Sequence, residues 1–150
     1  MFGNPVRGPR IVPFGQPRLR TDVLNNGHPA FRVTQSFGHW DAIFGGIHGA
    51  MDIGNFFCGD SVYSMLGGVA IHLRDPNGAL GVEVSHANAW RTQVWHLSKI
   101  NVPNGVRVPK GRLLGRVGST GLNIGGCHVH VVTIDPMGHI RDPWPLLDQN

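Results

Sequence analysis

The stretch Gly125-Gly126-Cys127-His128-Val129-His130-Val131-Val132, near the C-terminus, is the segment around which the chain is organised. Its β-branched residues predict a strand that begins after a glycine-rich turn. Because side chains alternate along a strand, His128 and His130 share one face, and the neighbouring valines point to the other. Two such imidazoles can bind a metal together, or one can bind it while the other faces the group that the metal activates. The alternative is a pair of polar side chains on the wet face of a half-buried strand.

The rest of the chain shows the same pattern of short strands and tight turns. Its 150 residues include 22 Gly and 11 Pro, which are scattered rather than repeated. Asp75-Pro76-Asn77-Gly78 is a strong turn signal, and no segment shows a long 3.6-residue period. We therefore expect an all-β domain, a twisted antiparallel sheet arranged as a cradle or sandwich. Besides the histidine strand, the expected strands lie at about 31–35, 61–64, 68–73, 80–85, 91–97 and 112–117, and residues 105–111 form a short strand that leads into a turn.

Residues 1–30 differ from the remainder in composition. Prolines at four-residue spacing stand among four arginines, and the segment carries a net +3 of the formal +4 charge. Proline favours extended backbone, yet the segment is too apolar for a free linker. We expect an extended arm that packs against another protein or along the outside of its own domain, residues 31–150.

Two classes of function are not expected. The charge of residues 31–150 is close to neutral, so charge alone does not indicate a nucleic-acid surface. No run reaches the 18 apolar residues that a membrane span requires.

Further histidines and an aspartate could join the histidine strand in a metal site. His48 and Asp52 flank a glycine-rich segment that favours a loop for His48 and a short strand for Asp52. His96 falls on the expected strand at 91–97. A catalytic zinc takes three protein ligands and leaves one position open. In isolation, His48 and Asp52 fit a surface histidine and a turn aspartate better than a metal site.

The two cysteines, Cys58 and Cys127, can pair with each other or remain free, and the sequence does not decide between these states. Cys127 is out of phase with the two histidines of its strand, so we do not expect it to bind the metal.

Taken in order, these motifs resemble the lysostaphin-type zinc metallopeptidases, peptidoglycan endopeptidases with the duplicated hybrid motif fold. The resemblance extends from about Val33 to about Leu147. The matching segments are Gln35-Ser36-Phe37-Gly38, His48-Gly49-Ala50-Met51-Asp52-Ile53, Gly59-Asp60-Ser61-Val62-Tyr63, Trp95-His96-Leu97-Ser98-Lys99-Ile100, residues 109–121 and His128-Val129-His130.

This resemblance implies a site and its chemistry. His48, Asp52 and His130 would bind Zn²⁺. His96 and His128 would face the water that the metal activates, one as general base and the other as hydrogen-bond donor to the developing oxyanion. The sequence does not assign these two roles between them.

Some aromatic and histidine positions have less certain roles. The family often has an aromatic residue where Val94 stands, and here Trp95 follows instead, which indicates an altered substrate-binding surface. Trp90 and Trp95 either line that surface or belong to the core. His39 is a weaker candidate for the site, and we expect His86 to be structural.

The implied function is cleavage of the stem or bridge peptides that cross-link bacterial peptidoglycan. No apolar segment of secretory length follows Met1, so we expect no ordinary signal peptide, although this substrate lies outside the cytoplasm. A phage enzyme that is made in the host cytoplasm and carried by the virion tail would reach this substrate without a signal peptide. Tail proteins would then be the partners of residues 1–30. The alternatives are a phage lysis endolysin, a non-catalytic assembly module with the same fold, and an amidase or carboxypeptidase of the same polymer.

Overall fold

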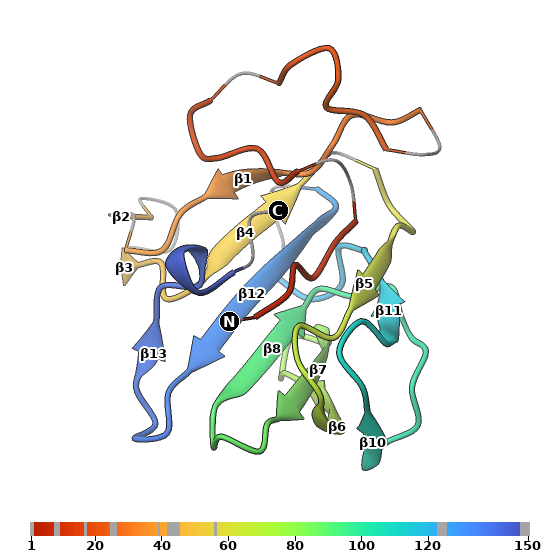
Figure 1. Cartoon of the computed structure of the whole chain (residues 1–150), viewed down its shortest axis with the longest axis vertical. Helices are drawn as coiled ribbons and strands as arrows, with labels where there is room; N and C mark the ends of the chain where they lie inside the picture. Colours follow the sequence, from red (N-terminus) through yellow and green to blue (C-terminus); the bar gives the residue numbers. More distant parts are fainter. Residues whose placement is uncertain are drawn as a thin grey trace.

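The computed structural model describes residues 2–7, 10–16, 18–24, 27–38, 40–41, 46–55, 57–122 and 126–147. The expectation of an all-β chain is confirmed, since the regular structure of these residues consists of thirteen strands and one short 3-10 helix (Figure 1). Every ladder between named strands is antiparallel. None of the described residues belongs to a helix long and apolar enough to cross a membrane.

The main sheet is built around the histidine strand, which has a partner on each side. Its order is β1 (Arg32–Gln35), β4 (Met51–Gly54), β12 (His128–Ile134), β8 (Arg91–Trp95), β7 (Leu80–Ser85), β6 (Gly68–Arg74) and β10 (Val106–Val108), with β13 (Ile140–Arg141) also paired to β12. A second sheet contains β5 (Ser61–Tyr63), β11 (Leu113–Arg116) and β9 (Lys99–Ile100). A third contains β2 (Trp40–Asp41) and β3 (Gly46–Ile47), and the 3-10 helix η1 spans Trp144–Leu146.

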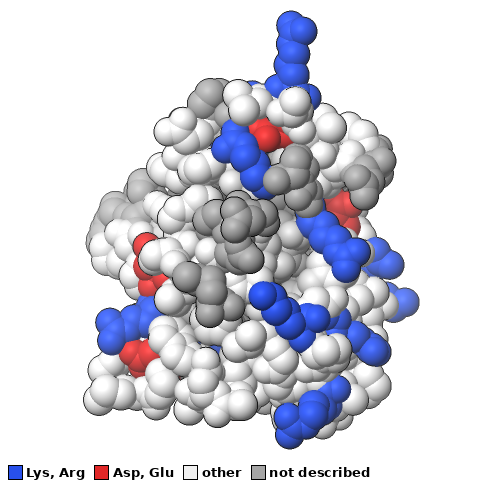
Figure 2. Space-filling model, in the orientation of Figure 1, with Lys and Arg blue, Asp and Glu red and all other residues white. Residues whose placement is uncertain are grey.

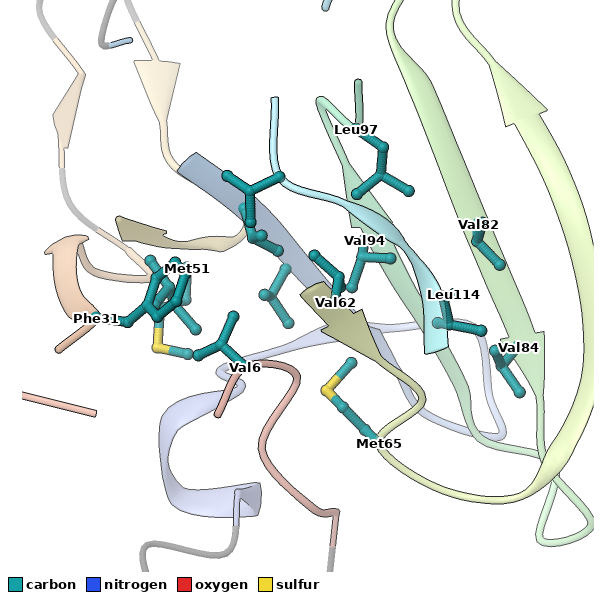
Figure 3. Packing of buried hydrophobic residues seen from close by; sticks show 14 of the residues in the cluster. Val6, Phe31, Met51, Val62, Met65, Val82, Val84, Val94, Leu97 and Leu114 are labelled. Atoms are coloured by element: carbon teal, nitrogen blue, oxygen red, sulfur yellow. The ribbon is translucent and has the colours of Figure 1, made fainter. Parts of the chain in front are cut away.

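The hydrophobic core lies between one face of the main sheet and the second sheet. Valines of β7 and β8 pack in one cluster with Val62 of β5 and Leu114 of β11 (Figure 3). Val129 and Val131 of β12 are fully buried on the core side, as the alternation of the histidine strand predicts. His128 and His130 therefore lie on the opposite face of the main sheet.

The N-terminal segment contributes to this core. Phe2, Val6, Ile11 and Val12 are each at most 5% exposed and belong to the buried part of the domain. The backbone N–H of Phe2 donates to the carbonyl oxygen of Leu146 in η1 (2.9 Å). In Figure 1 the red N-terminal segment accordingly begins close to the dark blue η1 and then runs away from it. The boundary at residue 30 remains a prediction from composition.

Three of the four arginines of this segment contact the chain itself. Arg10 pairs with the carboxylate of Asp22 through two hydrogen bonds of 2.9 Å. Arg18 donates to the carbonyl oxygen of Ala30 (2.9 Å), and the Arg7 guanidinium lies 4.1 Å from the centre of the Tyr63 ring. On the face drawn in Figure 2, Lys and Arg side chains stand in separate groups with uncharged surface between them.

The two cysteines form a disulfide bond. It joins Cys58, shortly after β4, to Cys127, immediately before β12, and their Cα atoms are 5.3 Å apart. The bond therefore ties together the two neighbouring strands that carry Asp52 and the histidine pair.

Candidate metal centre

The register between β4 and β12 places three of the five expected site residues together. Asp52 pairs directly with His130, and Gly54 pairs with His128. A Cβ on Gly54 would lie 3.2 Å from the Cβ of His128, so this glycine leaves room for the His128 side chain. His48 precedes β4 in the loop after β3, as the glycine-rich sequence predicts.

The donor atoms of His48, Asp52 and His130 lie within 4.8 Å of one another. Asp52 Oδ1 is 2.8 Å from His130 Nδ1, and Asp52 Oδ2 is 3.4 Å from His48 Nε2. Zinc bonds of about 2.0–2.2 Å in tetrahedral geometry hold ligand atoms roughly 3.3 Å apart. The three residues therefore fit a zinc ion with small adjustments of their side chains, and two imidazoles with one carboxylate are ordinary zinc ligands.

Backbone carbonyl oxygens orient the imidazoles. His48 Nδ1 lies 3.3 Å from the Ser36 oxygen, and His128 Nδ1 lies 3.0 Å from the Gly126 oxygen. Because a carbonyl only accepts, each Nδ1 carries a proton, and in the neutral ring each Nε2 carries the lone pair. His128 Nε2 is 3.7 Å from Asp52 Oδ1, so it faces the carboxylate from beside the three-donor group.

His96 reaches the same place by a route that strand alternation does not predict. The expectation that it lies on a strand is wrong, because β8 ends at Trp95 and His96 has a left-handed backbone with φ of 67°. Trp95 pairs with His130 and shares its face, so a continuing strand would turn residue 96 toward the core. The left-handed turn instead brings the His96 ring to 5.1 Å from that of His128 and 5.5 Å from that of His130, between ring centres.

The His96 ring is held by a hydrogen bond from Nδ1 to the carbonyl oxygen of Thr120 (2.8 Å). This bond leaves Nε2 as the basic nitrogen. The main-chain oxygens of Ser36, Thr120 and Gly126 that orient the three rings carry no sequence signal, because every residue supplies the same carbonyl group.

The electrostatics of the site favour a charged carboxylate and a neutral imidazole. Burial is the largest effect on Asp52 and opposes its ionisation, but hydrogen bonds from His130 and His48 and the charges of His130 and His128 outweigh it, so the pKa of Asp52 lies well below its ordinary value. Burial is also the largest effect on His96 and lowers its pKa, helped by His128 and His130 and opposed by the Thr120 carbonyl. Both residues therefore have the charge state that metal binding and proton acceptance require near neutral pH.

The remaining histidines lie away from this group. His86 is buried, with Nδ1 bonded to the Gly67 oxygen (2.8 Å) and Nε2 to the Thr92 hydroxyl (3.0 Å), which is the structural role that we expected. His28 contacts the Phe57 ring, His72 is exposed on β6, and His139 is an exposed side chain next to Asp135. His39 lies outside the described residues.

Trp90, in the turn before β8, and Trp95, at the end of β8, lie on opposite sides of the main sheet. Trp90 packs against the main core, with its ring centre 5.6 Å from that of Phe2. Trp95 instead packs with a small cluster on the histidine face, formed by Ala50, Val132 and Ile134.

Comparison with known proteins places this arrangement in a family. Residues 46–143 match the model of peptidase family M23. The chain is 37% identical over 73 residues to the peptidoglycan DD-endopeptidase ShyA of Vibrio cholerae, an alignment that covers 48% of this chain and 17% of ShyA.

Solved structures show the same fold. A zinc-containing peptidase from Vibrio cholerae superimposes with a TM-score of 0.65 at 25% identity, over 85% of this chain and 39% of that one. The catalytic domain of lysostaphin from Staphylococcus simulans superimposes with a TM-score of 0.67 at 24% identity, over 77% of this chain and 91% of that domain.

The chain thus spans well under half the length of the two Vibrio proteins that it resembles. The family model, however, covers well over half of the chain, and it includes all five residues of the site. Together with the fitting donor set, this similarity assigns Zn²⁺ as the metal of the centre. The chain belongs to peptidase family M23.

Proposed function

We propose that this chain is a zinc-dependent endopeptidase that cleaves the peptide cross-links of bacterial peptidoglycan. The observation that carries the proposal is the grouping of His48, Asp52 and His130 within 4.8 Å, with His96 and His128 beside them. The family match and the named activity of ShyA support the substrate class.

We propose the following roles for the five residues, which this geometry supports. Zinc held by the three donors supplies the activation of water and of the peptide carbonyl. A neutral imidazole at His96 or His128 accepts the proton of the attacking water and later delivers it to the leaving amine. The other imidazole donates a hydrogen bond to the carbonyl oxygen as negative charge develops on it.

Digestion of purified peptidoglycan followed by chromatography and mass spectrometry of the products tests this proposal. We expect zinc-loaded protein to convert cross-linked dimers into monomers and to expose a new amino group at the former cross-link. The variant His72→Ala, which removes an exposed histidine of β6, should keep this activity.

The same products distinguish the rival functions. An amidase would separate peptides from glycan strands without cutting dimers, and a carboxypeptidase would shorten stem peptides. A non-catalytic module would leave the wall unchanged although it bound zinc, and that result would refute the proposal.

We further propose that the enzyme acts outside the cytoplasm. The disulfide bond between Cys58 and Cys127 supports this location, because disulfides persist in oxidising environments and are rare in the cytosol. Delivery by a phage tail is the route that we propose from the sequence, with a lysis enzyme as the alternative. Mass spectrometry of purified phage particles would detect the chain in the first case and miss it in the second.

A further inference from the structure

An aromatic residue, Trp95, lies next to the metal site on the same face of the main sheet. The paired residues of four adjacent strands read Asp52, His130, Trp95 and Gly81, from β4 to β7. Directly paired residues of antiparallel strands point to the same face, with their Cβ atoms about 5 Å apart. Trp95 therefore begins beside His130, on the side opposite to Asp52.

Gly81 provides the space that the indole occupies. A Cβ on this residue would lie 2.7 Å from Cε3 and 2.8 Å from Cδ2 of Trp95, so the six-membered part of the ring lies directly on the β7 backbone. The ring also contacts the small apolar cluster of Ala50, Val132 and Ile134, which is separate from the main core. An uncharged, partly exposed apolar surface thus adjoins the metal ligands.

A chain of hydrogen bonds fixes the orientation of this indole. Trp95 Nε1–H donates to Gln93 Oε1 (2.9 Å), and Gln93 Nε2 donates to Glu83 Oε2 (2.7 Å). Arg91 donates to the same carboxylate oxygen (3.3 Å), and the Glu83 side chain is only 9% exposed. Because a carboxylate only accepts, Glu83 orients the Gln93 amide so that its oxygen faces the indole.

We propose that Trp95 is a specificity-determining residue, which receives the aliphatic side chain of the substrate residue next to the scissile bond. The proposal rests on the endopeptidase function proposed above. An alanyl methyl group buries apolar area against the indole, whereas a glycyl residue offers nothing to bury. Gln93 and Glu83 are positioning residues that act through the Trp95 N–H. The site therefore selects alanyl over glycyl cross-links.

Two synthetic cross-link peptides that differ only in alanine or glycine beside the scissile bond test the selection. We expect wild-type protein to show a kcat/KM about tenfold higher for the alanyl peptide, since one methylene in an apolar pocket discriminates roughly 10–200-fold. Trp95→Ala should lower the ratio of the two values to near one, with zinc content unchanged. Trp90→Phe, which alters a tryptophan on the core side, should leave the ratio intact.

The ratio of the two kcat/KM values does not depend on the fraction of folded enzyme, so it can be measured even for a variant that folds poorly. Wild-type protein that cleaves neither peptide nor purified wall would refute the proposed function. A wild-type enzyme that cleaves both, with a preference that Trp95→Ala leaves unchanged, would refute the role of Trp95 alone.

A double-mutant cycle tests whether Gln93 acts through Trp95. Trp95→Phe keeps an aromatic ring but removes the N–H that Gln93 accepts. We expect Gln93→Leu to reduce the alanyl preference several-fold in the wild-type background and to have no further effect in the Trp95→Phe background. An equal effect of Gln93→Leu in both backgrounds would show that Gln93 acts independently and would overturn its positioning role.

Discussion

At the scale of single residues, the left-handed backbone of His96 is the feature that completes the site. With φ of 67°, this residue occupies a conformation that costs a non-glycine residue about 1–2 kcal/mol. The cost is tolerated because the turn re-aims the imidazole from the core face to the metal face. Strain of this kind is often concentrated at functional sites.

The strain can be measured by comparing two substitutions of His96. His96→Gly should be more stable to urea than His96→Ala by about 1 kcal/mol, because glycine adopts positive φ without a steric cost. Both variants should lose peptidase activity, since both lack the imidazole. Equal stability of the two variants would contradict a strained backbone at this position.

His86 predicts a dependence of stability on pH. Burial is the largest effect on this residue and lowers its pKa, against the opposing hydrogen bond to Gly67. The unfolded chain therefore takes up a proton below about pH 6.5, while folded His86 stays neutral until a lower pH. Its contribution to stability is full above pH 6.5 and is lost as the pH falls toward the folded pKa.

Urea unfolding at pH 7.5 and 5.5, with a chelator present throughout, measures this contribution. The free energy of unfolding of the wild type should fall between the two pH values by more than that of His86→Asn. An identical fall in the two proteins would show that His86 does not contribute to the acid sensitivity.

At the scale of elements, the disulfide bond links the two strands that carry Asp52 and His130, two of the proposed metal ligands. It closes a loop with a sequence separation of 69 residues between the end of β4 and the start of β12. The chain-entropy model gives about 4 kcal/mol for a loop of this size. The same covalent bond restrains the relative positions of Asp52 and His130, which the proposed zinc site requires.

Reduction of this bond should lower both stability and zinc affinity. We expect a phosphine reductant to lower the urea midpoint and zinc retention of the wild type, and to leave Cys58→Ala/Cys127→Ala unaffected. If the wild type were indifferent to reduction that mass spectrometry shows to be complete, the bond would have no role in holding the site.

The N-terminal segment is the second element with a clear energetic role. Phe2 is 5% exposed and packs beside Trp90 and His86, whereas Phe14 is 49% exposed. Phe2→Ala should lower the free energy of unfolding by about 3 kcal/mol, and Phe14→Ala should change it by less than about 0.5 kcal/mol. Equal effects in urea unfolding would contradict the inclusion of this segment in the core.

At the scale of the whole molecule, the sequence predicts the fold class and most strands because alternation and turn residues are local signals. The same alternation places His128 and His130 on one face, as the structure shows. It fails at His96, where a positive φ in a histidine has no local signature. The order of the motifs along the chain still identifies His96 as a site residue, because the resemblance to the family does not depend on which face of a strand a side chain occupies.

Other features depend on contacts that no local pattern encodes. Pairing of Cys58 with Cys127 requires β4 and β12 to be neighbours, which the sequence does not state. The sequence predicts an arm that packs against another protein or along the outside of its own domain. Val6 and Ile11 are instead buried in the core, because the apolar residues between the prolines dominate the packing. The proline content of this segment predicts its extended backbone, but contacts with the rest of the domain determine which of its side chains are buried.

We propose that His48, Asp52 and His130 bind zinc while His96 and His128 act on the substrate. Zinc content by mass spectrometry, measured beside wall cleavage in three proteins, tests it most directly. We expect the wild type and His128→Ala to hold one zinc ion per chain, with cleavage lost in His128→Ala, and His130→Ala to hold almost none. Full zinc occupancy in His130→Ala, or a zinc-free His128→Ala, would contradict this assignment.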